Sequence, residues 1–259
     1  MDINIFKERI DKDGFFIIPN LLTSDFVAEL NRDCLSWVNV CEQYQISAGI
    51  NVAGDGTGHH SVGANDSIDR FIAQHILHKY IDTYFNQKPY ILHACNPLKG
   101  EPKKLNYVHN IHRDTKTFIP DYHFRLNIIV MLDDFKKDNG ATQVLLGSHL
   151  LPERPDEIIF NKNHVSLLGK AGTVVLFNSY LWHKGGINIT DKNRVALTLS
   201  FSPAFIKPQM DYARLLGEEY GRNLSDLTRQ VLGYNARVPI SLKEWYQTSE
   251  HRLYHSNQG

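Results

Sequence analysis

The chain has 259 residues, of which 42% are hydrophobic and 22% are charged, so it can bury a sizeable core without disulfides or a structural metal. Its 28 basic and 28 acidic residues balance without a long run of like charge, which disfavours nucleic acid and anionic membranes as partners. No segment approaches the ~20 apolar residues of a membrane-spanning helix, and the N-terminus lacks a signal-peptide pattern. We therefore expect a soluble cytoplasmic protein, a monomer or homodimer, with a small-molecule substrate.

The first part of the chain predicts helices around one short strand. Residues 3–12 have helical spacing, and the apolar residues 15–18 indicate a strand that ends at Pro19. Thr23 is then a typical N-cap for a helix that reaches about residue 38.

A glycine-rich segment follows, from residue 47 to residue 65. It holds five glycines and no apolar periodicity, which indicates a mobile loop or lid. Apolar residues recur with helical spacing from 68 to 85 and predict one further helix before the strands begin.

Short β-branched segments separated by turns predict strands between residues 90 and 201. The clearest are 126–132, 172–177 and the strand that Arg194 opens. Helix signals return after residue 206, including a capping box at Ser241. We expect one domain over residues 1–259, with a helical flank at about 1–88, a barrel at about 89–205 and a helical extension at about 206–259.

The pattern with the most chemical content is His112, Asp114 and the distant His183. On an extended strand His112 and Asp114 leave the same face, so both side chains can bind one metal ion. Two imidazoles and one carboxylate can occupy one face of octahedral iron(II) and leave three positions free. We interpret these three residues as the catalytic metal ligands.

The order of the surrounding motifs resembles the phytanoyl-CoA dioxygenase family of iron(II)/2-oxoglutarate oxygenases. The matching segments are Asp13-Gly14-Phe15-Phe16, Asn139-Gly140, Gly147-Ser148-His149, Trp182-His183 and Asn193-Arg194, where Arg194 follows His183 by eleven residues. The resemblance covers roughly residues 10 to 205. It implies a mainly β fold with flanking helices around a double-stranded β-helix, the jelly-roll core shared with cupins.

The resemblance also implies the cofactor iron(II) and the cosubstrate 2-oxoglutarate, whose distal carboxylate Arg194 would hold. Strand alternation from Arg194 places Thr198 and Ser200 on the same face, where their hydroxyls could add cosubstrate contacts. Asn127 lies in an otherwise apolar strand, and a buried amide must find hydrogen-bond partners. It is either a further cosubstrate contact or a structural amide.

The predicted reaction is hydroxylation of an aliphatic carbon in a small molecule or an acyl-CoA, with release of succinate and carbon dioxide. Two alternatives remain open. A zinc metallohydrolase could use His109 beside the same three residues, although Arg194 would have no role there. A cupin-like barrel could also bind a small molecule without turnover.

Overall fold

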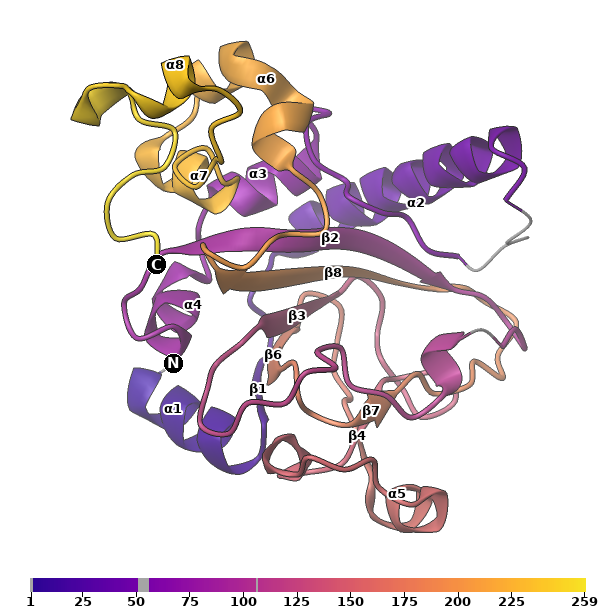
Figure 1. Ribbon diagram of the computed structural model, residues 1–259. Coiled ribbons are helices and arrows are strands. Elements are labelled where there is room, and N and C mark those ends of the chain that lie inside the picture. Colours follow the sequence, from indigo (N-terminus) through magenta and orange to yellow (C-terminus); the bar gives the residue numbers. More distant parts are fainter. Residues whose placement is uncertain (1, 51–55, 106) are drawn as a thin grey trace.

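Two antiparallel β-sheets pack together, and helices cover the outer face of the larger one (Figure 1). The computed structural model describes residues 2–50, 56–105 and 107–259. The larger sheet has the strand order β1-β6-β3-β8-β2 and the smaller one β5-β4-β7. The strands are β1 (Phe15–Ile18), β2 (Tyr90–Gly100), β3 (Leu126–Met131), β4 (Gln143–Val144), β5 (Val165–Ser166), β6 (Val174–Asn178), β7 (His183–Lys184) and β8 (Arg194–Pro203).

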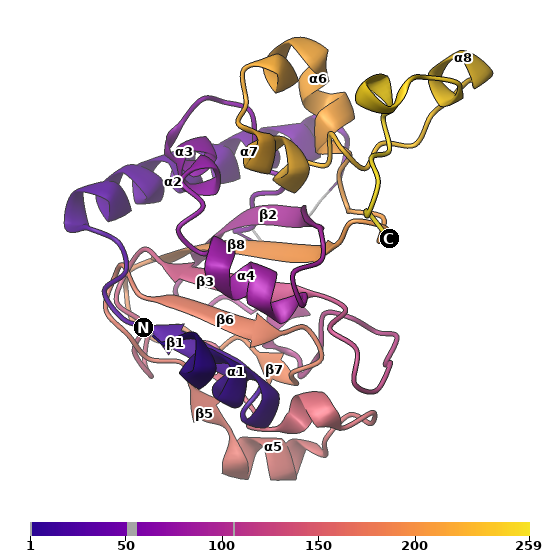
Figure 2. The same cartoon turned by 90° about the vertical axis from the view of Figure 1, so that its left-hand side faces the viewer.

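The helices hold more residues than the strands, so the expectation of a mainly β chain is wrong and the fold is mixed α/β. They are α1 (Ile3–Lys12), α2 (Ser24–Ser47), α3 (Ser67–Ala73), α4 (His78–Tyr84), α5 (Glu157–Asn163), α6 (Tyr212–Arg222), α7 (Asp226–Val231) and α8 (Leu242–Trp245). Figure 2 shows α2, α3, α6 and α7 above β2 and β8, with α1 and α4 beside the other strands. Within the described ranges, no helix is long and apolar enough to cross a bilayer.

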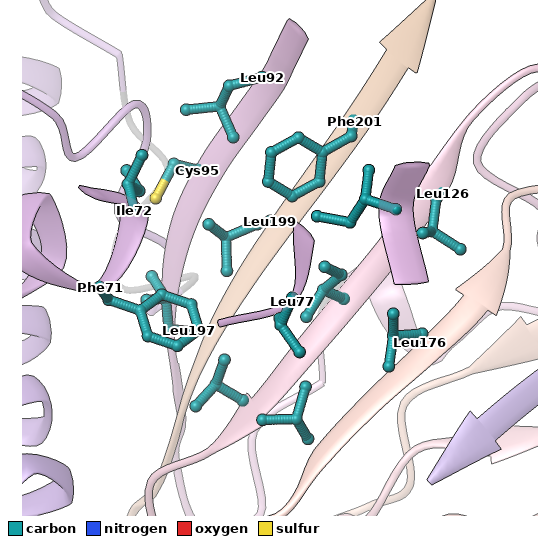
Figure 3. Packing of buried hydrophobic residues seen from close by; sticks show 14 of the residues in the cluster. Phe71, Ile72, Leu77, Leu92, Cys95, Leu126, Leu176, Leu197, Leu199 and Phe201 are labelled. Carbon is teal, nitrogen blue, oxygen red and sulfur yellow. The ribbon is translucent and has the colours of Figure 1, made fainter. Parts of the chain in front are cut away.

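Alternate residues of the larger sheet point to opposite sides of it. On the outer side, Leu126, Leu199 and Phe201 pack with Phe71 and Leu77 from the helical layer (Figure 3). Full burial of such a side chain contributes about 1.5–3 kcal/mol, so this face supplies much of the stability. A second apolar cluster on the inner side joins the two sheets; it contains Ile129, Phe177 and Ala196 of the larger sheet and Val144 and Leu181 from the other side.

Two helix predictions need correction. The Thr23 side chain caps the backbone N–H of Phe26 as expected, but α2 continues to Ser47 rather than ending near residue 38. Its last turns are largely exposed, so they carry no apolar periodicity that a sequence pattern could show. The helix predicted over 68–85 is two helices, because His75 between them has a positive φ of 51° and bonds through Nε2 to the Thr228 hydroxyl.

The glycine-rich segment is anchored over most of its described length. Thr57 forms an isolated bridge with Leu98 of β2, and the Gly58 N–H donates to the Pro97 carbonyl at 2.8 Å. Farther along, the Ser61 N–H donates to the Cys95 carbonyl at 3.0 Å. Residues 56–62 therefore lie against β2, and the mobility expected of this segment stays a prediction; residues 51–55, including Gly54, lie outside the described residues.

Candidate metal centre and its cavity

Backbone pairing brings His112 and His183 together although 71 residues separate them. Each donates its backbone N–H to the carbonyl of the other, at 2.9 and 2.8 Å, in an isolated antiparallel bridge. Asp114 lies in a bend, and its N–H donates to the Ser179 carbonyl at 3.1 Å. The expectation of a regular strand under His112 and Asp114 is thus wrong, since only the single bridge forms, yet the side chains still converge.

The three side chains form the one group of potential metal ligands of this size that the described residues contain, with ligand atoms within 4.8 Å of one another. Nε2 of His112 lies 3.7 Å from Oδ1 of Asp114, and Nε2 of His183 lies 3.9 Å from Oδ2. The Nδ1 atoms of both rings face backbone carbonyls, of Asn110 at 2.7 Å and Leu181 at 2.8 Å. Because a carbonyl can only accept, each Nδ1 carries the proton and each Nε2 presents its lone pair to the cluster.

The charges of this cluster suit a metal ion. Burial and the neighbouring His183 lower the pKa of His112, so its ring is neutral at physiological pH. Burial alone would raise the pKa of Asp114, but the attraction of His183, Arg125 and His112 outweighs it and lowers that pKa. Neutral imidazole and ionised carboxylate are the forms that bind metal.

Asn127 holds the carboxylate of the cluster. Its Nδ2 donates to Oδ2 of Asp114 at 2.7 Å, which fixes the carboxylate orientation from the inner face of β3. The sequence left open whether Asn127 contacts the cosubstrate or is a structural amide. In the structure its amide contacts the candidate metal ligand Asp114.

One cavity of about 430 Å³ lies between the sheets and contains the cluster. All seven site residues inferred from the sequence line it: His112, Asp114, Asn127, His183, Arg194, Thr198 and Ser200. The Thr198 hydroxyl donates to the Asn96 carbonyl at 2.9 Å, and Ser200 is buried on the same face of β8.

Arg194 is a half-buried cation that has no ion pair in the described part of the chain. Its guanidinium lies 4.3 Å from the centre of the Phe135 ring, and its buried Nε has no hydrogen-bond partner. Burial lowers its pKa to about 10, against the opposing attraction of Asp133. That carboxylate already accepts the Val195 N–H at 2.7 Å. A guanidinium in this state favours an incoming anion.

Comparison with known proteins identifies the family of this chain. Residues 10–196, most of the chain, match the family model described as phytanoyl-CoA dioxygenase. The chain belongs to the phytanoyl-CoA dioxygenase family. The clearest sequence motifs, from Asp13-Gly14 to Arg194, all fall inside this match.

Relatives within and around the family agree with this assignment. The uncharacterised protein Rv1501 of Mycobacterium tuberculosis is 38% identical over 148 residues, which cover 57% of this chain and 54% of that protein. Dioxygenase cdmD of Talaromyces verruculosus is 28% identical over 143 residues, covering 50% and 46% of the two chains. The chain therefore spans about half the length of the curated relatives it matches.

Solved structures share the fold. EctD from S. alaskensis, crystallised with 2-oxoglutarate and 5-hydroxyectoine, superposes with a TM-score of 0.60 at 20% identity, over 78% of this chain and 76% of that one. The same protein has also been crystallised with bound Fe.

In this member of the phytanoyl-CoA dioxygenase family, His109, His149 and Arg113 lie outside the metal-ligand cluster. His109 belongs to a short 3-10 helix and is not part of the ligand group. His149 is buried against the N-terminal region, where its Nε2 bonds to the Asp11 carbonyl at 3.1 Å. Arg113 points away from the cluster and lies over the rings of Trp182 and Tyr180.

Among the polar residues of the cavity that the sequence reasoning did not single out are Asn96, Arg125 and Gln209. Arg125 was the one with a usable signal, because it immediately precedes the apolar strand and alternation places it on the same side as Asn127. The others come from segments whose register with β8 and β3 no local pattern reveals.

Proposed function

We propose that the protein is an iron(II)/2-oxoglutarate-dependent dioxygenase. The observation that supports this best is the shared cavity: a His-Asp-His donor cluster and an unpaired arginine line the same space. The first is suited to a metal ion and the second to a dicarboxylate. EctD, with Fe in one crystal structure and 2-oxoglutarate in another, offers a precedent on this fold.

The residues present fit iron(II). Two imidazole nitrogens with free lone pairs and one ionised carboxylate are the donor set of non-haem iron oxygenases. The tautomers are set by the carbonyls of Asn110 and Leu181, and the Asp114 carboxylate is held by Asn127. These outer contacts orient the donors before a metal arrives.

Arg194 fits the distal carboxylate of 2-oxoglutarate. Its planar fork can donate two parallel hydrogen bonds, and the surrounding burial excludes water that would compete. When bound, iron(II) and 2-oxoglutarate supply the oxidation of the substrate, with succinate and carbon dioxide as products. The chain itself binds and orients the reactants, and the apolar side chains of Ile129 and Phe177 on the inner face keep water out of the cavity.

The two packed sheets support the double-stranded β-helix that the sequence suggested, and we extend the proposal to that topology within one domain over residues 1–259. The metal ligands would then sit where strands of the two sheets meet. His183 lies on β7 of the smaller sheet and is bridged to His112, and Asp114 is held by Asn127 on β3 of the larger sheet.

The substrate we propose is a small molecule hydroxylated at an aliphatic carbon. A cavity of about 430 Å³ lies in the range of small-molecule sites, and the cosubstrate takes part of it. For an acyl-CoA substrate, the cluster of Lys99, Lys103 and Lys104 would be the candidate set of phosphate contacts. Lys99 and Lys104 are instead both paired with Glu101, at 2.8 and 2.6 Å, which favours a free small molecule.

The zinc hydrolase alternative has less support. His109 does not join the ligand group, the described residues contain no second such group, and Arg194 has no role in hydrolysis.

The experiment that tests the proposal is turnover with a metabolite panel. Iron(II)-loaded protein should release succinate from 2-oxoglutarate under oxygen, faster with a true substrate, and lose this activity with His183→Ala. If the protein is a cupin-like barrel that binds a small molecule without turnover, it releases no succinate under any of these conditions. Activity with zinc in place of iron would overturn the oxygenase assignment.

A further inference from the structure

We infer that the substrate carries a carboxylate and that Arg125 binds it inside the cavity. This deepens the proposed function and rests on it, because it names the substrate class of the same site. Arg125 lies directly before β3, on the side of the strand that faces the metal-ligand cluster.

The first argument is that Arg125 is buried without a partner. Its residue surface is only 9% exposed, its Nε is buried with no hydrogen bond, and its guanidinium forms no ion pair within the described residues. Its backbone is well fixed, since its carbonyl accepts hydrogen bonds from the Tyr84 hydroxyl and the Ser179 N–H. A guanidinium is costly to bury unless something pairs with it.

Arg113 shows how this fold satisfies a buried arginine when its role is structural. It is 8% exposed, almost the same as Arg125, but it donates to the carbonyls of Leu151 and Lys116 and lies over three aromatic rings. Arg125 has none of these contacts and instead lines the cavity. Its missing partner is therefore expected to come from the cavity.

The position of Arg125 separates it from the cosubstrate arginine. Arg194 pairs in register with Gly100, whereas Leu126, the neighbour of Arg125, pairs with Phe201. Phe201 follows Arg194 by seven residues along β8, a distance of about 23 Å at the backbone for a strand rise of ~3.3 Å per residue. Asp114 interacts electrostatically with Arg125 but not noticeably with Arg194, which places Arg125 at the metal end of the cavity.

The charges in the cavity favour a monoanion. Among the described lining residues, Asp114 is the one carboxylate and Arg194 and Arg125 are the two arginines. Iron(II) and the 2-oxoglutarate dianion cancel, Asp114 cancels Arg194, and the positive charge of Arg125 remains. One carboxylate on the substrate would neutralise it.

The one carboxylate that lines the cavity near Arg125 is Asp114, which belongs to the metal-ligand cluster and already accepts a hydrogen bond from Asn127. The ring of His93 is close enough to repel Arg125 electrostatically, and burial together with this arginine lowers the pKa of His93 to about 4, so this ring is neutral at physiological pH. Its buried Nδ1 also lacks a partner. Gln209, at the exposed edge of the cavity, adds an amide that can contact the remainder of a polar substrate.

The test follows the arginine Nε–H resonances by NMR, with acetate as the carboxylate probe and acetamide as its neutral match. Zinc(II) replaces iron(II) to keep the protein diamagnetic, 2-oxoglutarate is saturating, and a metal-free sample without 2-oxoglutarate is run in parallel. Arg125→Lys assigns the Arg125 resonance, and Arg113 serves as an equally buried internal control.

We expect the Arg125 resonance to shift saturably with acetate in both samples and to stay in place with acetamide, while Arg113 does not respond to either. Arg125→Gln should then weaken a carboxylate substrate found in the turnover panel by about tenfold or more, with 2-oxoglutarate binding retained. Arg125→Lys should recover part of the loss.

Three results would overturn the inference: no saturable shift with acetate, an equal shift with acetamide, or a response of Arg125 to 2-oxoglutarate itself, which would assign it to the cosubstrate. The proposed function fails separately. If Arg194 does not respond to 2-oxoglutarate while Arg125 responds to acetate, the oxygenase assignment is wrong and the anion site stands.

Discussion

At the residue scale, the chemistry depends on a few buried polar side chains whose partners are set by neighbours distant in sequence. Arg194 and Asn127 face the same cavity but differ in what they contact. The buried Nε of Arg194 has no hydrogen-bond partner, whereas the Asn127 amide donates to Asp114. Their substitutions should therefore affect different ligands.

Arg194→Ala should weaken 2-oxoglutarate binding by roughly 30-fold or more and leave the iron content unchanged. Loss of a desolvated bidentate pair costs about 2–5 kcal/mol, largely because the carboxylate is left unpaired. Arg194→Lys should recover only part of the affinity, since a point charge does not reproduce the planar fork. Anaerobic calorimetric titration measures both. An unchanged affinity with a lowered melting temperature would show that Arg194 is structural.

Asn127→Ala should weaken metal binding by about 10- to 100-fold, because it removes the hydrogen bond that orients Asp114. Thr198→Val is the matched control: its hydroxyl lines the same cavity but bonds to the Asn96 carbonyl, so metal affinity should be retained. Competition with a metal-sensitive dye measures the affinity. If Asn127→Ala instead spares the metal and weakens 2-oxoglutarate, the amide serves the cosubstrate.

At the scale of elements, the cavity depends on how segments dock onto the larger sheet. Residues 56–62 cover β2 through backbone hydrogen bonds, and Thr57 and His59 of this segment line the cavity. Over these residues, the glycine-rich stretch that the sequence pattern marks as flexible forms a wall of the site.

Two glycines test this docking. Gly56 and Gly49 both have φ near 70°, so alanine is strained at either position by about the same amount. A Cβ on Gly56 would lie 2.1 Å from the Lys99 carbonyl oxygen, whereas one on Gly49 would meet nothing within 4 Å. Gly49→Ala should cost about 1 kcal/mol of unfolding free energy, and Gly56→Ala about 1–3 kcal/mol more.

Denaturant melts of the two glycine variants give the difference. Hydrogen exchange should also show that Gly56→Ala, and not Gly49→Ala, loosens residues 57–62. Equal stability of the two variants would mean that this segment is not held against β2.

At the scale of the whole molecule, metal and cosubstrate should stabilise the fold because they bind the native cavity and not the unfolded chain. With ligand at 100 times its dissociation constant the gain is about 2.7 kcal/mol, which for a chain of this size raises the melting temperature by roughly 5–10 °C. Scanning calorimetry without oxygen measures the shift, and a chelator should reverse it.

The triad variants supply the control for this measurement. His112→Ala, Asp114→Ala and His183→Ala each remove one of three donors, so each should abolish the iron-dependent shift while the metal-free protein stays folded. If a variant keeps both the iron-dependent shift in melting temperature and succinate formation, the substituted residue is not a metal ligand.

The sequence alone predicted the candidate ligands and the anion-binding arginine. His112, Asp114, His183 and Arg194 form an ordered signal along the chain, and strand alternation places Thr198 and Ser200 on the side of Arg194 without any knowledge of the fold. Several strand positions followed from the same kind of pattern, because β3 and β6 are largely apolar segments bounded by turns and β8 alternates apolar and polar residues; the two-residue strands β4, β5 and β7 were not predicted individually.

The partners of those side chains became visible in the folded structure alone. Register between segments far apart in the chain sets three features: the hydrogen bond from Asn127 to Asp114, the lack of a partner for Nε of Arg125, and the docking of residues 56–62 on β2. A pattern along one segment reports which face a residue takes, because that depends on backbone geometry alone. The same pattern does not report which residue lies opposite, because backbone pairing between distant segments, such as the bridge between His112 and His183, determines the neighbour.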